Sequence, residues 1–154
     1  MTLVYRNISS PIGEITLVAD DRTLRVVAWG EHLERLISGM GPLRHEEIHP
    51  ILDRTSAQLT RYFAGELKEF DVPLELEGTD FQRRAWGELS RIPYGNAISY
   101  QEQARRLGRP EASRAVGGAN GKNPISILVP CHRVVSSSGL LTGYAGGLDA
   151  KRYL

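Results

Sequence analysis

Cysteine is nearly absent from this sequence: Cys131 is the only one in 154 residues. One thiol cannot form an intramolecular disulfide, and it is too few for a structural zinc site built on cysteines. Long apolar runs are missing as well, since even ISILVP is far shorter than the roughly 20 residues of a membrane-spanning helix. These absences argue against a disulfide-stapled domain, a cysteine-rich metal site and a membrane protein.

The start of the chain also lacks the apolar core of a secretion signal. MTLVYRNISS becomes polar within six residues, whereas a signal peptide carries a longer apolar segment there. An unpaired thiol is typical of reducing compartments. We therefore expect a cytoplasmic protein.

The net charge is small, but the charged residues are unevenly distributed. The formal net charge is +1. Residues 1–78 carry 8 Lys and Arg against 13 Asp and Glu, a net of −5, and residues 79–154 carry 11 against 5, a net of +6. Only the second part suits a polyanionic partner such as DNA, and a chance scatter of solvated charges is the alternative.

The first part of the sequence predicts a β-meander followed by helices. Apolar and polar residues alternate over Leu3–Ile8 and Glu14–Ala19, and a third strand is expected at Leu24–Trp29, with turn residues between the strands. Two helical stretches should follow, one of them Pro50–Ala64, where apolar residues recur at helical spacing after a proline. Phe70–Leu76 reads as a short extended segment.

The second part predicts mainly helices. Thr79 or Asp80 should cap the first of them, and Ser99 with Glu102 has the spacing of a capping box for a helix that ends at Gly108. Pro110 suits the first turn of another helix, which should run to about Gly118. Two helices joined by a short glycine turn form a helix-turn-helix. We expect an α/β (α+β) fold with two domains, residues 1–77 and 78–154.

Two glycines near the expected end of that last helix have two explanations. Gly117 and Gly118 each cost about 1 kcal/mol relative to alanine inside a helix. Either they mark the helix C-terminus, where glycine is favoured, or a partner must approach the backbone closely. The sequence leaves both open.

Cys131 also has two interpretations. The thiolate is the nucleophilic form, and an ordinary thiol with a pKa of about 8.5 needs a base or a positive field to reach it. His132 and Arg133 follow directly, but neighbouring side chains diverge, so His132 would reach the sulfur through water or a tight turn. Alternatively, a cysteine after ISILVP is a small buried apolar residue.

Several motifs decide between these interpretations. PCHRV at Pro130–Val134 follows NP at Asn123–Pro124 and precedes GYAGG at Gly143–Gly147. SYQE, RAVGGAN and GTDFQRRAW occupy 99–102, 114–120 and 78–86. These motifs, and their order along the chain, resemble those of the methylated-DNA–protein-cysteine methyltransferases, repair proteins that remove alkyl groups from guanine O6. The likeness covers residues 78 to the end, and the N-terminal meander is consistent with it.

The resemblance implies a fold and a reaction. The first domain would be a ribonuclease-H-like β-meander plus helices, and the second a winged helix-turn-helix, with its wing near Ser136–Gly139. Cys131 would accept the alkyl group once and keep it, without cofactor or metal. His132 would activate Cys131 through water, Tyr100 would donate a hydrogen bond to guanine N3, and Asn123 would brace the cysteine segment.

The resemblance also implies how DNA is held. A monomer would dock the second helix of the helix-turn-helix in the minor groove of double-stranded DNA and extrude an alkylated base, O6-methylguanine or O4-methylthymine. Arg114 would fill the vacated space. The expected DNA contacts are Gln101, Arg109, Ala112, Ser113, Arg114, Ala115, Gly118 and Ser137. The expected pocket residues are Pro130, Val134, Tyr144, Ala145 and Gly146.

Each of these residues also has a plainer explanation: a packed tyrosine, an Asn-Pro turn, a glycine-rich loop or a solvated arginine.

The family's last helix continues past LDAKRYL with a glutamate that completes a cysteine–histidine–water relay, but Asp149 is the only carboxylate after Tyr144. We therefore expect either a shortened chain or an incomplete relay. The rival functions are a lesion-binding protein that does not react and a cysteine hydrolase.

Overall fold

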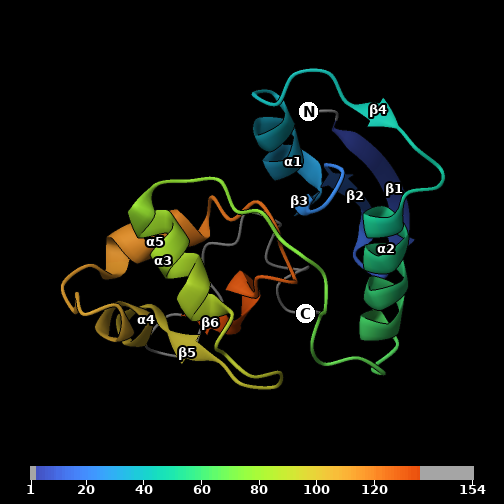
Figure 1. Cartoon of the computed structure of the whole chain (residues 1–154). Helices are drawn as coiled ribbons and strands as arrows, with labels where there is room; N and C mark the ends of the chain where they lie inside the picture. Colours follow the sequence, from blue (N-terminus) through green and yellow to red (C-terminus); the bar gives the residue numbers. More distant parts are fainter. Residues whose placement is uncertain (1–2, 136–154) are drawn as a thin grey trace. The chain divides into compact units, whose positions relative to one another are not determined.

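The computed structural model describes residues 3–135, and the contacts within the chain form two compact units, 1–76 and 77–154 (Figure 1). Each unit has its own sheet and its own helices. In the part that the structure describes, no helix combines the length and the apolar character needed to cross a membrane.

The first unit is built on a four-stranded sheet in the order β3-β2-β1-β4. β1 (Val4–Ser10), β2 (Gly13–Ala19) and β3 (Leu24–Ala28) form the antiparallel meander that the alternating pattern predicted. β4 (Arg44–His45) adds a short parallel edge next to β1. The pattern did not predict β4, because both of its residues are exposed and polar.

Helices α1 (Gly30–Ile37) and α2 (Pro50–Phe63) pack on this sheet. α1 supplies side chains to a cluster around Val18, Val26 and Ala28. Neighbouring residues of a strand point to opposite faces, so Leu17 and Val27 face the other way, and both are fully buried. α2 begins at Pro50 as predicted and ends at Phe63, one residue before the predicted end at Ala64.

The second unit packs three helices around a small apolar cluster. They are α3 (Asp80–Leu89), α4 (Tyr100–Arg106) and α5 (Ser113–Asn120). Two short strands, β5 (Ile98–Ser99) and β6 (Val134–Val135), pair in parallel, and the turn Cys131–Arg133 precedes β6. The shared cluster consists of Ala85, Ala104, Leu107, Val116 and Ala119.

Thr79 caps α3, and it does so more fully than expected. The Gln82 backbone N–H donates to the Thr79 hydroxyl at 3.1 Å. The Thr79 backbone N–H donates to the Gln82 side-chain oxygen at 3.0 Å. The expected capping box on α4 forms only by half. Ser99 accepts the Glu102 amide at 3.0 Å, but the Glu102 carboxylate binds Arg105 and Arg106 instead of the Ser99 amide.

The second helix of the helix-turn-helix differs from its prediction at both ends. α4 ends where expected, with Gly108 at φ 76°. Pro110, however, lies in a turn closed by the Ala112 amide and the Arg109 carbonyl at 2.9 Å, so α5 begins at Ser113. α5 continues to Asn120, which places both Gly117 and Gly118 inside it and rules out a helix end at these glycines. The wing expected at Ser136–Gly139 lies outside the described residues.

Candidate active site and DNA-binding face

Cys131 lies at the start of a single 3₁₀ turn. It is 6% exposed, as is His132, and both belong to the turn Cys131–Arg133. The Arg133 amide donates to the Pro130 carbonyl at 3.0 Å. The sequence left open whether His132 reaches the thiol through a tight turn or through water, and the chain does make a tight turn here.

The segment before Cys131, residues 123–131 (the cysteine loop), is organised by Asn123. The Asn123 amide nitrogen donates to the Val129 carbonyl at 2.7 Å, and its oxygen accepts the Ile125 amide at 3.0 Å. An ordinary Asn-Pro turn needs only the second bond. The first bond ties Asn123 to a carbonyl two residues before Cys131, as expected of a bracing residue.

Two tight three-residue turns bend the cysteine loop. The Leu128 amide donates to the Ser126 carbonyl at 2.9 Å around Ile127, whose φ is 73°. The Cys131 amide donates to the Val129 carbonyl at 2.9 Å around Pro130. A positive φ at a β-branched residue is strained by about 1–3 kcal/mol, and Ile127 is 1% exposed. The surrounding core therefore holds a strained backbone just before the thiol.

Arg133 fixes the far end of the turn. Its guanidinium donates to the Ile92 carbonyl at 2.7 Å and lies over the Tyr94 ring, 5.7 Å from the centroid. Both partners belong to the connection between α3 and β5. The thiol segment is thus held by Asn123 on one side and by Arg133 on the other.

Strand pairing brings Tyr100 to the same region as Cys131. β5 ends at Ser99, directly before Tyr100, and Ile98 pairs with Val134, three residues after Cys131. The Tyr100 ring is half-buried and packs against the cluster shared by α3, α4 and α5. A Cβ on Gly117 would lie 3.8 Å from the ring carbons of Tyr100. Two residues predicted to be catalytic therefore come from segments that lie side by side.

α5 exposes a narrow stripe of Arg114, Ala115 and Gly118, and buries Val116, Ala119 and Asn120. A Cβ built on Gly118 would meet no atom within 4 Å. No contact within the described residues therefore requires glycine at 118. This open space is compatible with close approach by a partner, the other explanation that the sequence left open. Of the other predicted DNA contacts, Gln101 and Arg109 are exposed, and Ala112 and Ser113 are half-buried.

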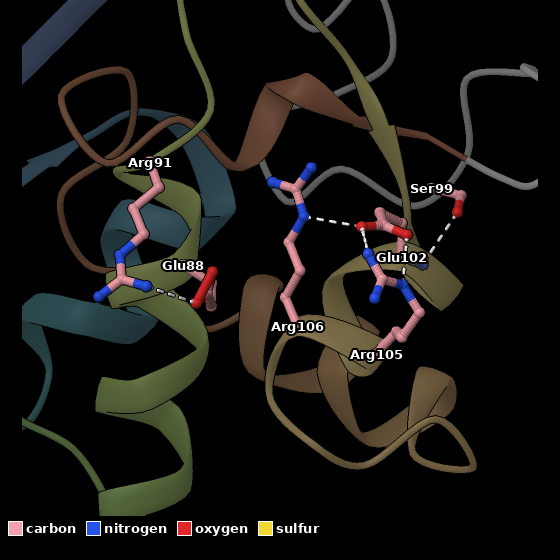
Figure 2. A network of polar contacts seen from close by, with 6 residues as sticks. All are labelled: Glu88, Arg91, Ser99, Glu102, Arg105 and Arg106. Atoms are coloured by element: carbon pink, nitrogen blue, oxygen red, sulfur yellow. Dashed lines mark hydrogen bonds and ion pairs between the residues drawn. The ribbon is translucent and has the colours of Figure 1, made fainter.

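The basic residues of α4 are partly neutralised. Glu102 bonds Arg105 at 2.8 Å and Arg106 at 2.8 Å, and Figure 2 shows its carboxylate between the two guanidinium groups. Hydrogen bonds from Arg105 and Arg106 lower the pKa of Glu102 to about 2. Both arginines thus share one carboxylate, whereas Arg114 and Lys122 are exposed beyond this network.

Four predicted site residues, Ser137, Tyr144, Ala145 and Gly146, lie outside the described residues. Pro130 and Val134 of the predicted pocket are buried beside the turn. No group of three or more possible metal ligands occurs within residues 3–135.

Sequence reasoning missed two features of this site. Arg133 was noted only as a charge near the thiol, and its bond to the Ile92 carbonyl has no sequence signal. Gln103 and Asn120 form a buried amide pair. A glutamine on the apolar side of a capped helix was the available clue for that pair.

Comparison with known proteins agrees with this geometry. The model of the DNA binding domain of 6-O-methylguanine DNA methyltransferase matches residues 80–154. The ribonuclease-like domain of the same family matches residues 3–76. Both parts of the expected fold are therefore confirmed.

Relatives and solved structures extend the match over the whole chain. The methylated-DNA–protein-cysteine methyltransferase of Methanosarcina acetivorans is 47% identical, covering 99% of this chain and 96% of that protein. The one from Mycobacterium tuberculosis is 51% identical over 97% of this chain and 88% of its own length. The structure of Mycobacterium tuberculosis OGT in complex with DNA has a TM-score of 0.88 and 48% identity, covering 97% of this chain and 88% of that one.

The motifs around Cys131, the two matched domains and the full-length relatives agree with one another. This chain belongs to the 6-O-methylguanine DNA methyltransferase family, the methylated-DNA–protein-cysteine methyltransferases.

Proposed function

We propose that this protein repairs alkylated double-stranded DNA by moving the alkyl group from guanine O6, or from thymine O4, to Cys131. The observation that carries the proposal is the position of the only cysteine. It is a buried thiol in a turn that Asn123 and Arg133 hold, beside the strand that leads into Tyr100.

The reaction balances without a cofactor. The sulfur of Cys131 forms a bond to the alkyl carbon while the carbon–oxygen bond breaks, and the electron pair passes to the base. The thiol proton leaves through His132 and water, and the guanine regains a proton. Tyr100 donates a hydrogen bond to guanine N3 as negative charge develops there. The product is a thioether, whose carbon–sulfur bond is stable in water, so each molecule reacts once.

DNA would bind through the exposed stripe of α5. Its small residues Ala115 and Gly118 allow a close approach of the sugar-phosphate backbone, as docking in the narrow minor groove requires. The target carbon lies inside the base stack, so the nucleotide must rotate out at a cost of a few kcal/mol. Arg114, exposed on α5, would occupy the vacated space.

Two further expectations belong to this proposal. A monomer suffices, because all the proposed catalytic residues come from one chain. A cytoplasmic location suits an acceptor that must stay a thiol until it meets a lesion.

The rival functions lack comparable support. A cysteine hydrolase needs a histidine and an orienting carboxylate or amide near the thiol; His132 is the one histidine in the sequence of the second unit, and the matched family and relatives give hydrolysis no support. A lesion-binding protein that does not react needs no nucleophile, whereas this site is built around one.

Mass spectrometry of the intact protein tests the proposal. After mixing with a duplex that contains O6-methylguanine, we expect the mass of the protein to rise by one CH₂ unit, located on the peptide that contains Cys131. Cys131→Ala should gain no mass and leave the lesion in place. A benzylguanine probe that the protein turned over many times would support the hydrolase instead.

A further inference from the structure

Two buried amide side chains join α4 to α5. Gln103 is fully buried and Asn120 is 7% exposed. The Gln103 nitrogen donates to the Asn120 oxygen at 3.0 Å, and the Asn120 nitrogen donates back to the Gln103 oxygen at 2.8 Å. The Gln103 nitrogen also donates to the Ala85 carbonyl of α3 at 3.1 Å. One amide pair thus links all three helices of the second unit.

This pair supplies two directional side-chain hydrogen bonds between α4 and α5, beside the Trp86–Ala119 bond that joins α3 to α5. The apolar cluster between the helices consists of three alanines, one leucine and one valine, with Phe81 and Tyr100 packed against it, and apolar contacts are non-directional. Hydrogen bonds weaken steeply with distance and angle. A fully satisfied buried polar group therefore favours one arrangement of the helices, which is the best-attested use of such groups.

The pair connects the parts of the site that must act together on DNA. α4 begins with Tyr100, and α5 carries Arg114. The backbone carbonyl of Asn120 accepts the Asn123 amide at 3.2 Å, at the start of the cysteine loop. A shift of α5 against α4 would therefore move Arg114 relative to Tyr100.

We propose that Gln103 and Asn120 are positioning residues that set α5 against α4 for alkyl transfer from DNA. The proposal rests on the docking of α5 described above. Transfer from DNA needs α5 in register with the pocket, since its stripe must dock while the base lies beside Tyr100. Transfer from a free base such as O6-benzylguanine needs Tyr100, the cysteine loop and His132, but not the docked stripe of α5.

Four proteins test this: the wild type, Gln103→Leu, the double variant Gln103→Leu/Asn120→Leu, and the swapped pair Gln103→Asn/Asn120→Gln. The double variant removes both amides without leaving either one unpaired. The swapped pair keeps the summed length of the two side chains and can restore the reciprocal bonds. Rate constants for a methylated duplex and for free O6-benzylguanine are measured at a temperature where thermal melting shows each protein to be folded.

We expect the two substrates to respond differently. A misplacement of about 1 Å costs on the order of a hundredfold in rate, so transfer from DNA should slow by at least about tenfold in Gln103→Leu, with benzylguanine changed by less than about threefold. The double variant should regain thermal stability yet stay slow on DNA. The swapped pair should return to within about threefold of the wild type on DNA.

Two results would overturn the proposal. Wild-type speed on DNA in the double variant would mean that the pair only fills the core. An equal loss for both substrates would mean that it acts on the pocket and not on α5. If Gln103→Leu fails to fold, the rates of the double variant and the swapped pair on DNA still test the proposal. Arg114→Ala separates the two proposals: wild-type speed on DNA in that variant would refute the docking of α5, whatever the amide pair does.

Discussion

At the scale of single residues, Asn123 holds the cysteine loop through both ends of its amide. Its nitrogen and oxygen each bond a backbone group of the loop, and the side chain is 1% exposed. Leaving those backbone groups unpaired in the core costs about 1–3 kcal/mol. The same bonds oppose relaxation of the strained turn at Ile127.

We therefore expect Asn123→Ala to lower the free energy of unfolding by about 1–3 kcal/mol and to slow alkyl transfer in the molecules that remain folded. Urea unfolding and single-turnover rates measure the two effects. Asn96→Ala, at an exposed position in the turn after α3, is the control and should change neither. A variant with wild-type rate would show that the amide does not position the thiol.

Gly78 is a second residue whose neighbours dictate its identity. A Cβ there would lie 2.7 Å from one indole carbon of Trp86 and 2.6 Å from the Gln82 side-chain oxygen. Trp86 cannot move easily, because it is 1% exposed and its indole N–H donates to the Ala119 carbonyl at 2.9 Å.

We predict that Gly78→Ala destabilises the protein by about 1–3 kcal/mol, the usual cost of overpacking. Gly87→Ala is the matched control on α3, since a Cβ there meets nothing within 4 Å. It should stabilise the helix by about 0.5–1 kcal/mol. Thermal melting compares the two variants, and a neutral Gly78→Ala would contradict the packing described here.

At the scale of elements, α5 is a helix that keeps glycine where its own packing does not need it. Gly118 lies inside the helix, and a Cβ added there would meet no atom within 4 Å, so helix propensity alone would favour alanine. The loss of helix stability is explained if a DNA backbone must approach α5 closely at this position.

Gly118→Ala should therefore raise the free energy of unfolding by about 0.5–1 kcal/mol while weakening binding to duplex DNA. Calorimetry and a binding titration at fixed salt measure both quantities. Gly87→Ala, which should gain similar stability, should leave DNA binding unchanged. If Gly118→Ala bound DNA as tightly as the wild type, close approach would not explain the glycine.

Glu102 of α4 makes the stability of the protein depend on pH. Hydrogen bonds from Arg105 and Arg106 lower its pKa to about 2, from an ordinary value of 4.5. A carboxyl group whose pKa is lower in the folded than in the unfolded protein stabilises the fold at pH values above its unfolded pKa. That stabilisation is lost as the pH falls toward its folded pKa. The contribution should thus be present above about pH 5 and disappear between about pH 5 and 2.

The prediction is that the Glu102 carboxyl, followed by carbon-13 NMR, titrates well below 4.5. Acid unfolding of Glu102→Gln should depend less steeply on pH over the same range than that of the wild type. Titration of Glu102 near its ordinary value would show that the paired arrangement in Figure 2 does not persist in solution.

At the scale of the whole molecule, the sequence predicted the meander, α2, the helix-turn-helix and the family, because alternation, caps and motifs are local signals. It misplaced the start of α5. Pro110 suits the first turn of a helix, but its fixed φ suits the second position of a β-turn equally well, and here it takes the turn. The capping box on α4 failed because two arginines compete for Glu102 with stronger, charge-assisted bonds.

The cysteine loop could not be predicted in detail. Its positive φ falls on Ile127, a residue that local preference excludes from that region. Only the packing of residues from several elements imposes it. The amide pair of Gln103 and Asn120 likewise joins residues 17 positions apart, beyond the reach of any periodic pattern.

Stoichiometry tests the central claim most directly. Increasing amounts of methylated duplex are mixed with a fixed amount of protein, and the repaired lesions are counted alongside the mass of the intact protein. If Cys131 keeps the alkyl group, repair stops at one lesion per molecule and every reacted chain is heavier by one CH₂ unit. Repair of many lesions by one molecule, or repair without a change in mass, would contradict the account.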